Sequence, residues 1–380
     1  MGEGLGVRLL ISKTMKILSL KLTNFRQYEN FEIDFDDKLT VIAGNNTKGK
    51  SSILEAIALL IDGNSPFTSD LDDIISYNAE FGTLNRYFRI QANINDNEKE
   101  FEFVFYYEKL KKQLLIDKKK VSKKTFHRYC ATIFSPEEIE ILMISASKRR
   151  EFLNNFIAKI DLDYRGNLVL FEKIHRQRNA YLKKLSKNFY DTGNFNINDQ
   201  QINYWTNEYA KASAKLMSKR SEIINKLCQI DETIKINYKP SLTLNLFEDL
   251  ANIEDLTRIH FDELMSKLKR DIALGYTHIG AHRDDWSIST DKDIKRYGSR
   301  GEKRVAIGNL LFLIQDILQK ELGYYPILLL DDISSELDDL NISKVMSQEY
   351  LSKQQTIITT IRENDLLNNF KLEEYKLVKL

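Results

Sequence analysis

The feature that most constrains the fold is VIAGNNTKGKSS, residues 41–52, near the front of the chain. Gly44, Gly49, Lys50 and Ser51 match the spacing G-x-x-x-x-G-K-[ST] of a phosphate-binding loop. In such a loop the glycines let backbone N–H groups curl around phosphates. The lysine reaches the β- and γ-phosphates, and the hydroxyl binds Mg²⁺. The segment therefore predicts a strand, a loop and a helix that bind ATP and Mg²⁺.

Both flanks of this loop have the required patterns. LTVIA, residues 39–43, is typical of a buried strand, and SSILEAIALL, residues 51–60, places its apolar residues on one helical face. The N-terminus of that helix would point its partial positive charge at the nucleotide. The predicted nucleotide contacts are Gly44, Asn45, Asn46, Thr47, Lys48, Gly49, Lys50, Ser51 and Ser52. Lys50 is also a predicted catalytic residue, and Ser51 a predicted metal ligand.

Composition limits the class of protein. The 380 residues are 42% hydrophobic and 29% charged, which is typical of a soluble globular chain with about two domains. The formal net charge of +1 provides no overall field, so a nucleic-acid site would have to be a local basic patch. Cys130 and Cys228 fit no metal spacing and favour a reduced, cytoplasmic setting. No apolar run is long enough to span a membrane.

The pattern changes along the chain predict an inserted domain. We expect residues 1–14 to be an N-terminal extension and residues 15–135 to form the β-rich first part of a nucleotide-binding lobe. Long stretches of helical periodicity follow Pro136, so residues 136–270 are predicted to form a helical arm or lid. Residues 271–380 are predicted to complete the nucleotide-binding lobe. The alternative, an ordinary all-α domain of the same lobe, stays open.

A second half of the site is expected after YYPILLLDDI, residues 324–333. Its run of apolar residues is typical of a parallel strand buried on both faces. Adjacent acids at the end of such a strand are costly unless a metal or cation uses them. Asp331 is therefore predicted to hold Mg²⁺, and Asp332 to act as the general base that polarises the attacking water.

The separation of the two halves indicates the ATPase class. Lys50 and Asp331 are about 280 residues apart in the sequence. A gap of this size implies an insertion between the halves, as in ATPases of the ABC and SMC types. That class has a Ser-x-Gly element before a helix, which binds the γ-phosphate held by a second subunit. Ser299 and Gly301 fit this element, and SSELDD, residues 334–339, resembles the D-loop of the class.

Several segments together resemble the RecF family of recombination-repair ATPases. The resemblance extends from about Met15 to the C-terminus. It is carried by LKLTNFRQYENFEIDF, IFSPEEIEI, SKRREFLNNFIAKID, HRQRNAYLKK, GYTHIGAHRDDW and LLLDDISSELD. The family has Gly-Pro-His-Arg-Asp-Asp where this chain has Ala281 in place of proline. Glu302 and Lys303 stand where the family usually has two glutamines, and IDGNSPFTSDLDD departs from a basic stretch of the family.

The resemblance implies an α/β fold, an ABC/SMC-type P-loop ATPase head with a β-rich lobe and an inserted helical arm. It implies a slow ATPase that forms a homodimer on binding ATP and clamps DNA at single-strand gaps. The implied DNA partners are single-stranded DNA and gapped duplex DNA. The implied partners are RecO, RecR and RecA. Two alternatives stay open: a RecF-like switch of a defence or mobile-element system, and a nucleotide-binding scaffold that makes no DNA contact.

Further residues allow two interpretations each. Arg26 follows a strand and is predicted to reach the nucleotide, although a surface hairpin arginine would look the same. His282 and Arg283 are either structural or in contact with nucleotide or DNA. Two basic stretches, residues 109–128 and 172–187, could contact DNA phosphates, but charge runs are usually solvated faces. In the second stretch the candidate cations are Arg176, Arg178, Lys183, Lys184 and Lys187.

Overall fold

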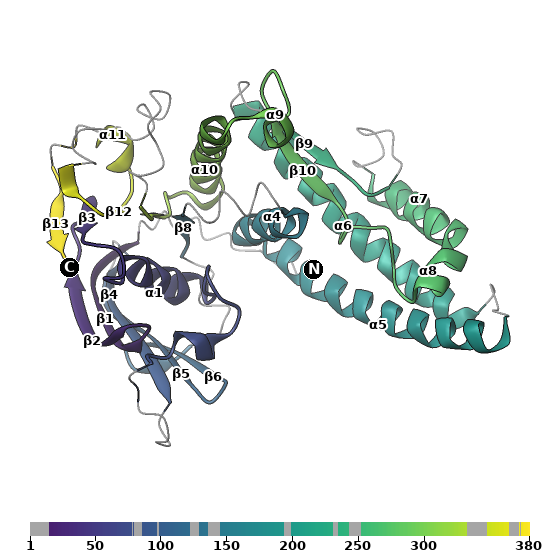
Figure 1. Ribbon diagram of the computed structural model, residues 1–380, viewed down its shortest axis with the longest axis horizontal. Helices are drawn as coiled ribbons and strands as arrows, with labels where there is room; N and C mark the ends of the chain where they lie inside the picture. Colours follow the sequence, from purple (N-terminus) through teal and green to yellow (C-terminus); the bar gives the residue numbers. More distant parts are fainter. Residues whose placement is uncertain are drawn as a thin grey trace, which may run out of the picture. The chain divides into compact units, whose positions relative to one another are not determined.

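The computed structural model describes residues 15–77, 79, 86–96, 99–121, 129–135, 145–193, 199–230, 235–242, 252–332, 348–364, 372 and 374–380. The predicted extension 1–14 lies outside these residues. The chain divides into two compact units (Figure 1). The first unit comprises Met1–Ile139 and Ile307–Leu380, and the second comprises Glu140–Ala306.

The first unit contains an antiparallel sheet with the strand order β2-β1-β4-β5-β6-β7. Strand β4 alternates buried with more exposed side chains, because one face packs on the core, and the pattern of β1 is shifted by an irregularity between Ile17 and Ser19. The expected hairpin of the first two strands is present, with Leu20 paired to Ile33. The strands are β1 (Lys16–Phe25), β2 (Tyr28–Asp34), β4 (Tyr87–Asn95), β5 (Glu100–Glu108), β6 (Lys111–Ile116) and β7 (Lys119–Lys120).

The first unit also contains a parallel sheet with the order β13-β3-β12-β11-β8. All four strand pairs are parallel. The three central strands are buried along their whole length, which explains their continuous apolar or β-branched sequences. The strands are β3 (Leu39–Ala43), β8 (Ala131–Phe134), β11 (Ile327–Leu330), β12 (Thr356–Thr360) and β13 (Lys376–Lys379).

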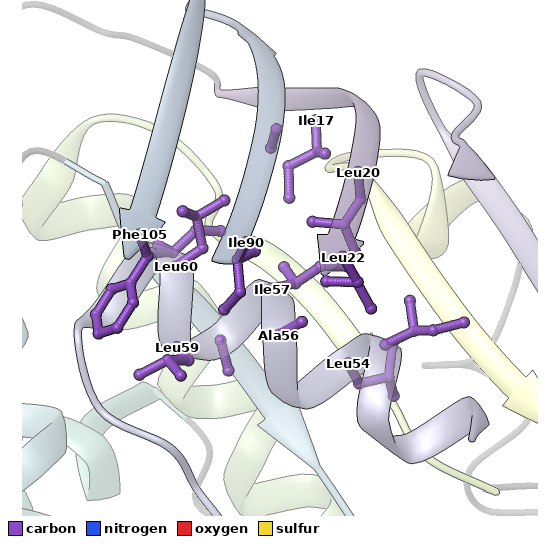
Figure 2. Packing of buried hydrophobic residues seen from close by; sticks show 14 of the residues in the cluster. Ile17, Leu20, Leu22, Leu54, Ala56, Ile57, Leu59, Leu60, Ile90 and Phe105 are labelled. Carbon is purple, nitrogen blue, oxygen red and sulfur yellow. The ribbon is translucent and has the colours of Figure 1, made fainter. Parts of the chain in front are cut away.

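Helix α1 (Lys50–Asp62) lies between the two sheets. Ten of its 13 residues are buried, so it is surrounded by core rather than amphipathic. Figure 2 shows its side chains, among them Leu54 and Ile57, beside Leu22 of β1 and Ile90 of β4. The short helices η1 (Leu71–Ile74) and α11 (Gln348–Leu351) also belong to this unit. The core thus fixes the start of α1 at the edge of the parallel sheet.

The second unit is built around two long helices that pack side by side, α5 (Leu162–Thr192) and α6 (Gln200–Ile230) (Figure 1). A two-stranded antiparallel sheet joins β9 (Lys235–Lys239) to β10 (Asp285–Ser289). The other described helices are α4 (Ala146–Ile160), α7 (Ile253–Ser266), α8 (Leu268–Leu274) and α9 (Ile294–Tyr297). Helix α10 (Arg300–Leu322) contains the boundary between the units. No helix in the described ranges is long and apolar enough to cross a bilayer.

The division of the chain differs from the prediction at its second boundary. The helical part was predicted to end at residue 270, whereas the second compact unit continues to Ala306. The segment after residue 270 belongs to this unit because β10 pairs with β9 and because two buried ion pairs hold it to the long helices. These pairs are Arg178–Asp271 and Arg220–Asp284, with N–O distances of 2.8 and 3.1 Å.

Candidate nucleotide-binding site

The phosphate-binding loop has the backbone that its glycines predict. It follows β3 and leads directly into α1. Thr47 and Gly49 have positive φ angles of 73° and 86°, and a β-branched residue is rarely found there. A Cβ atom at Gly49 would lie 2.4 Å from Gln27 Nε2 and 2.7 Å from the Tyr28 hydroxyl. Only glycine therefore fits at the last position of the loop.

The side chain of Lys50 reaches back across the phosphate-binding loop and contacts its backbone. Its Nζ donates hydrogen bonds to the carbonyl oxygens of Gly44 and Asn45, at 2.7 and 3.1 Å. Helix α1 has no side-chain cap and no acidic residue in its first turn. The first N–H groups of a helix have no intrahelical partner, and the helix dipole favours anions there. This arrangement leaves positive charge and amide donors for a phosphate group.

Tyr28 supports the predicted phosphate-binding loop, a contact that was not predicted from the sequence. Its hydroxyl donates to the backbone carbonyl of Lys48 at 2.9 Å, so the tip of the β1–β2 hairpin supports the loop. Burial raises the pKa of Tyr28 to about 12, which keeps the hydroxyl protonated as a donor. Its ring stacks on Phe31, with centroids 4.4 Å apart. The Asn-Phe-Arg-x-Tyr segment contained this residue, but no local pattern indicated its contact with the loop.

Arg26 makes a bidentate ion pair with Glu55 of α1. Its Nε and Nη2 donate to the two carboxylate oxygens at 2.7 Å each, and Nη1 donates to the carbonyl of Asp73 at 3.0 Å. Glu55 is 2% exposed and also accepts from the Ser65 hydroxyl at 2.6 Å. The structure thus gives Arg26 a structural partner on the helix that follows the loop, and its contact with a nucleotide stays a prediction.

The two acidic residues lie at the same sheet edge as the loop. β3, β12 and β11 are adjacent and parallel, so their carboxyl ends meet at one edge. The Thr359 hydroxyl at the end of β12 donates to Asp331 Oδ1 at 2.5 Å and accepts from the Asp332 N–H at 2.9 Å. Asp332 has a positive φ of 43°, an uncommon conformation of the kind found at functional sites. One buried threonine therefore orients the Asp331 carboxylate and holds the backbone of Asp332.

The residues present fit ATP and Mg²⁺. Within the described residues there is no cluster of three or more His, Cys, Asp or Glu side chains that could hold a metal by itself. Mg²⁺ usually takes one or two protein ligands together with substrate phosphates and water. The Ser51 hydroxyl and the Asp331 carboxylate are hard oxygen donors of this kind. The predicted roles of Asp332 as base and of Asn46 and Ser52 as nucleotide contacts stay predictions.

The predicted γ-phosphate element forms a capping box at the start of α10. The Ser299 hydroxyl accepts from the Glu302 N–H at 3.2 Å, and the Glu302 carboxylate accepts from the Ser299 N–H at 2.7 Å. Lys292 also pairs with Glu302 at 2.7 Å, and this hydrogen bond with the Ser299 bonds lowers the Glu302 pKa to about 2. The S-x-x-E spacing was a signal that sequence reasoning missed. Gly301 lies in the first turn of α10.

Three predicted features lie wholly or partly outside the described residues. These are the D-loop segment 334–339, residues 136–144 at the start of the predicted helical part, and residues 122–128 of the first basic stretch.

The second basic stretch contains one wrong candidate. Arg178 was among the cations that could contact DNA, but its side chain is 0% exposed and pairs with Asp271. The stretch is helical, as predicted, and residue 178 lies on the face of α5 that packs inward. Arg176, Lys183, Lys184 and Lys187 are exposed. Exposure therefore separates four available cations from one structural arginine.

His282 has structural contacts, whereas Arg283 is exposed. The ring nitrogens of His282 lie 2.7 Å from the Tyr209 hydroxyl and 3.0 Å from the Thr277 carbonyl oxygen. Burial, with a smaller effect from His175, lowers the His282 pKa to about 3. A neutral histidine with hydrogen bonds at both ring nitrogens positions a loop and does not bind a phosphate.

Comparison with known proteins supports the same class. The model of the RecF/RecN/SMC N-terminal domain matches residues 16–378. A DNA replication and repair protein RecF of Ruminiclostridium cellulolyticum is 33% identical, covering 91% of this chain and 92% of that protein. RecF of Clostridium acetobutylicum is 30% identical, covering 93% and 94%. The solved structure of the recombination mediator protein RecF-ATPrS of the RecFOR pathway is 26% identical, with a TM-score of 0.80 and coverage of 97% and 96%.

Proposed function

The chain belongs to the RecF family, and on this premise we propose that it is an ATP-dependent DNA-binding protein of recombinational repair and replication. The observation that carries the proposal is the sheet edge itself. It brings the loop of Lys50, the carboxylate of Asp331 and the adjacent Asp332 to the carboxyl ends of neighbouring parallel strands. The RecF relatives match more than nine tenths of this chain, and not a shared loop alone, which supports the repair role.

The chain's own residues have distinct roles in this proposal. When bound, ATP and Mg²⁺ supply the phosphoanhydride bond and the positive charge beside it. Lys50 and the start of α1 hold phosphate oxygens, and Ser51 with Asp331 holds the metal. Asp332 takes a proton from the attacking water. Thr359 orients the Asp331 carboxylate and holds the backbone N–H of Asp332 through its two hydrogen bonds.

We propose that Ser299 and Gly301 act on the nucleotide of a second copy of the chain, as the resemblance implies. ATP then joins two subunits, the closed dimer holds DNA, and hydrolysis releases it. Turnover is slow, because a clamp requires residence time. The proposed partner proteins of this step are RecO, RecR and RecA, and we propose that the protein acts in the cytoplasm. The support for this arrangement is the position of Ser299 at the N-terminus of the long helix α10.

The first test measures DNA affinity of the full chain for gapped, single-stranded and duplex DNA in parallel, with and without ATP. The proposal expects ATP to strengthen binding and gapped or single-stranded DNA to be preferred. It also expects affinity to fall steeply with salt, because phosphate contacts release counterions. Absence of DNA binding both with and without ATP would favour a nucleotide-binding scaffold. Equal DNA binding in the two conditions would contradict the ATP dependence.

The second test asks whether the site is shared. Lys50→Ala and Ser299→Arg are made as separate proteins, and each homodimer is expected to be inactive. Mixing them creates dimers in which one site combines the intact Lys50 of one chain with the intact Ser299 of the other. Partial recovery of ATPase activity supports the shared site. Full ATPase activity of monomeric Ser299→Arg would remove the clamp mechanism.

A further inference from the structure

The loop between α8 and β10, residues 275–284, runs along α5 in a defined register. At its start, a Cβ atom on Gly275 would lie 3.8 Å from Lys183 Cα. In its middle, the N–H and hydroxyl of Thr277 donate to Asn179 Oδ1 at 2.8 and 2.7 Å. Towards its end, the His282 and His175 rings lie 4.3 Å apart. The loop therefore follows about two turns of α5 in the antiparallel direction.

Buried arginines of the long helices hold this loop from beneath. Arg178 of α5 donates to the Thr277 hydroxyl at 2.6 Å, and Arg220 of α6 donates to the Ala281 carbonyl at 2.7 Å. Gly280 has a φ of 120°, and a Cβ atom there would lie 2.3 Å from the Tyr209 hydroxyl. Side chains on the outer surface of the loop are thus presented from a fixed backbone.

The outer surface of the loop carries an aromatic ring beside cations. Tyr276 is 41% exposed, and the guanidinium carbon of exposed Arg283 lies 5.9 Å from its ring centroid. Next to the loop, Arg176, Lys183 and Lys187 of α5 are exposed at the spacing i, i+7 and i+11, which places them on one helical face. Among the residues that the structure describes, none of these four cations has an ion-pair partner.

This lack of partners distinguishes the four cations from many others on the second unit. Lys211 pairs with Glu208 at 3.0 Å, Lys226 with Glu222 at 3.3 Å, and Arg258 with Asp255 at 2.9 Å. A surface cation that has its own carboxylate contributes little field to an incoming anion. No paired carboxylate in the described residues cancels the field of these four cations, so this field stays available to an external phosphate.

We propose that Tyr276, Arg283, Arg176 and Lys183 form a contact site for single-stranded DNA on the second unit. The cations bind backbone phosphates, and the tyrosine ring stacks with an unpaired base. An exposed aromatic ring among cations favours a single strand, because the bases of a duplex are already stacked on one another. The proposal rests on the DNA-binding function proposed above and adds where the strand is contacted.

The test uses the full chain with ATP and two fluorescein-labelled probes, oligo(dT) and a duplex of equal length. Tyr276→Ala should weaken oligo(dT) binding by about 5- to 100-fold and leave duplex binding nearly unchanged, and Tyr276→Phe should keep wild-type affinity. The triple variant Arg176→Gln, Lys183→Gln, Arg283→Gln should reduce the salt slope for oligo(dT) by about 2, at roughly 0.7 per phosphate contact. Its matched control, which removes the same charge, is Lys211→Gln, Lys226→Gln, Arg258→Gln.

The outcomes separate this inference from the proposed function. If the wild-type protein binds no DNA with ATP, the proposed function fails first. If it binds DNA and the triple variant keeps the same affinity and salt slope, this site is refuted while the function stands. Cross-linking with 5-iododeoxyuridine in oligo(dT) should recover the peptide that contains Tyr276. Recovery of cross-links only elsewhere contradicts the inference. Unchanged tryptophan fluorescence and ATP affinity verify that each variant is folded.

Discussion

Arg26→Ala distinguishes two roles for the arginine that follows β1. In the structure its guanidinium satisfies both carboxylate oxygens of Glu55, which is 2% exposed. Breaking a buried pair by removing one partner costs about 3–5 kcal/mol, because the other charge stays buried. Arg26 itself is 27% exposed and Ser65 keeps one bond to Glu55, so we expect the lower end, about 3 kcal/mol.

The assay must resolve the two units. The two tryptophans of the chain, Trp205 and Trp286, both lie in the second unit, so their fluorescence in urea reports on that unit alone. Amide hydrogen exchange of α1 and β4 reports on the first unit. We expect exchange there to become about a hundredfold faster in Arg26→Ala, while the fluorescence transition stays in place.

A double variant provides the control. Arg26→Met with Glu55→Gln removes both charges and should restore most of the lost protection, because no carboxylate is left buried without its partner. ATP affinity, measured where the single variant is folded, should change by less than threefold. Wild-type hydrogen exchange together with a tenfold loss of ATP affinity would refute the structural role and support the nucleotide contact.

Four further outcomes are expected. Lys50→Ala should abolish ATP binding in equilibrium titration while circular dichroism stays unchanged, because its bonds are to the loop it serves. Asp332→Asn should bind ATP normally but hydrolyse it at least a hundredfold more slowly in single-turnover assays; normal hydrolysis would place the base elsewhere. Thr359→Val should lower kcat about tenfold or more with a smaller change in KM, and Thr359→Ser should retain activity, since only the hydroxyl orients Asp331. His260 has its pKa lowered to about 3 by burial, so the unfolded chain binds the proton first. Through His260 alone the second unit should lose about 2 kcal/mol of stability between pH 6.5 and 4.5. His260→Leu should reduce the pH slope of the unfolding free energy by that amount, monitored by tryptophan fluorescence, while the lowered pKa values of His175 and His282 keep the remaining slope.

Local patterns predicted the elements that carry the nucleotide site. The alternation of residues 16–25, the buried runs 39–43 and 327–330 and the glycine-lysine loop each encode their own structure within a few residues. The structure shows that they meet at one sheet edge, because the strands that carry them are adjacent and parallel. The family membership, inferred from ordered motifs, is confirmed by the matches along the chain.

Local sequence patterns could not predict contacts between residues that are far apart in the sequence. Arg178 and Asp271 are 93 positions apart, so nothing near Arg178 distinguished a buried arginine from a solvated one. Tyr28 and Lys48 are 20 positions apart and meet only because a hairpin folds onto the loop. The end of the second unit was misplaced for the same reason, since β10 resembles a strand of either sheet until its partner β9 is known.

The capping box at Ser299 has a consequence for the affinity between subunits. The Ser299 hydroxyl accepts the cap hydrogen bond from the Glu302 N–H, so its own hydrogen stays available to donate. In the proposed dimer, a contact with the neighbouring molecule's phosphate would add to the cap and would not replace it. The cap already holds the serine side chain in place before the phosphate arrives. Less side-chain entropy would then be lost when two subunits associate, so this contact would contribute more of its energy to the affinity.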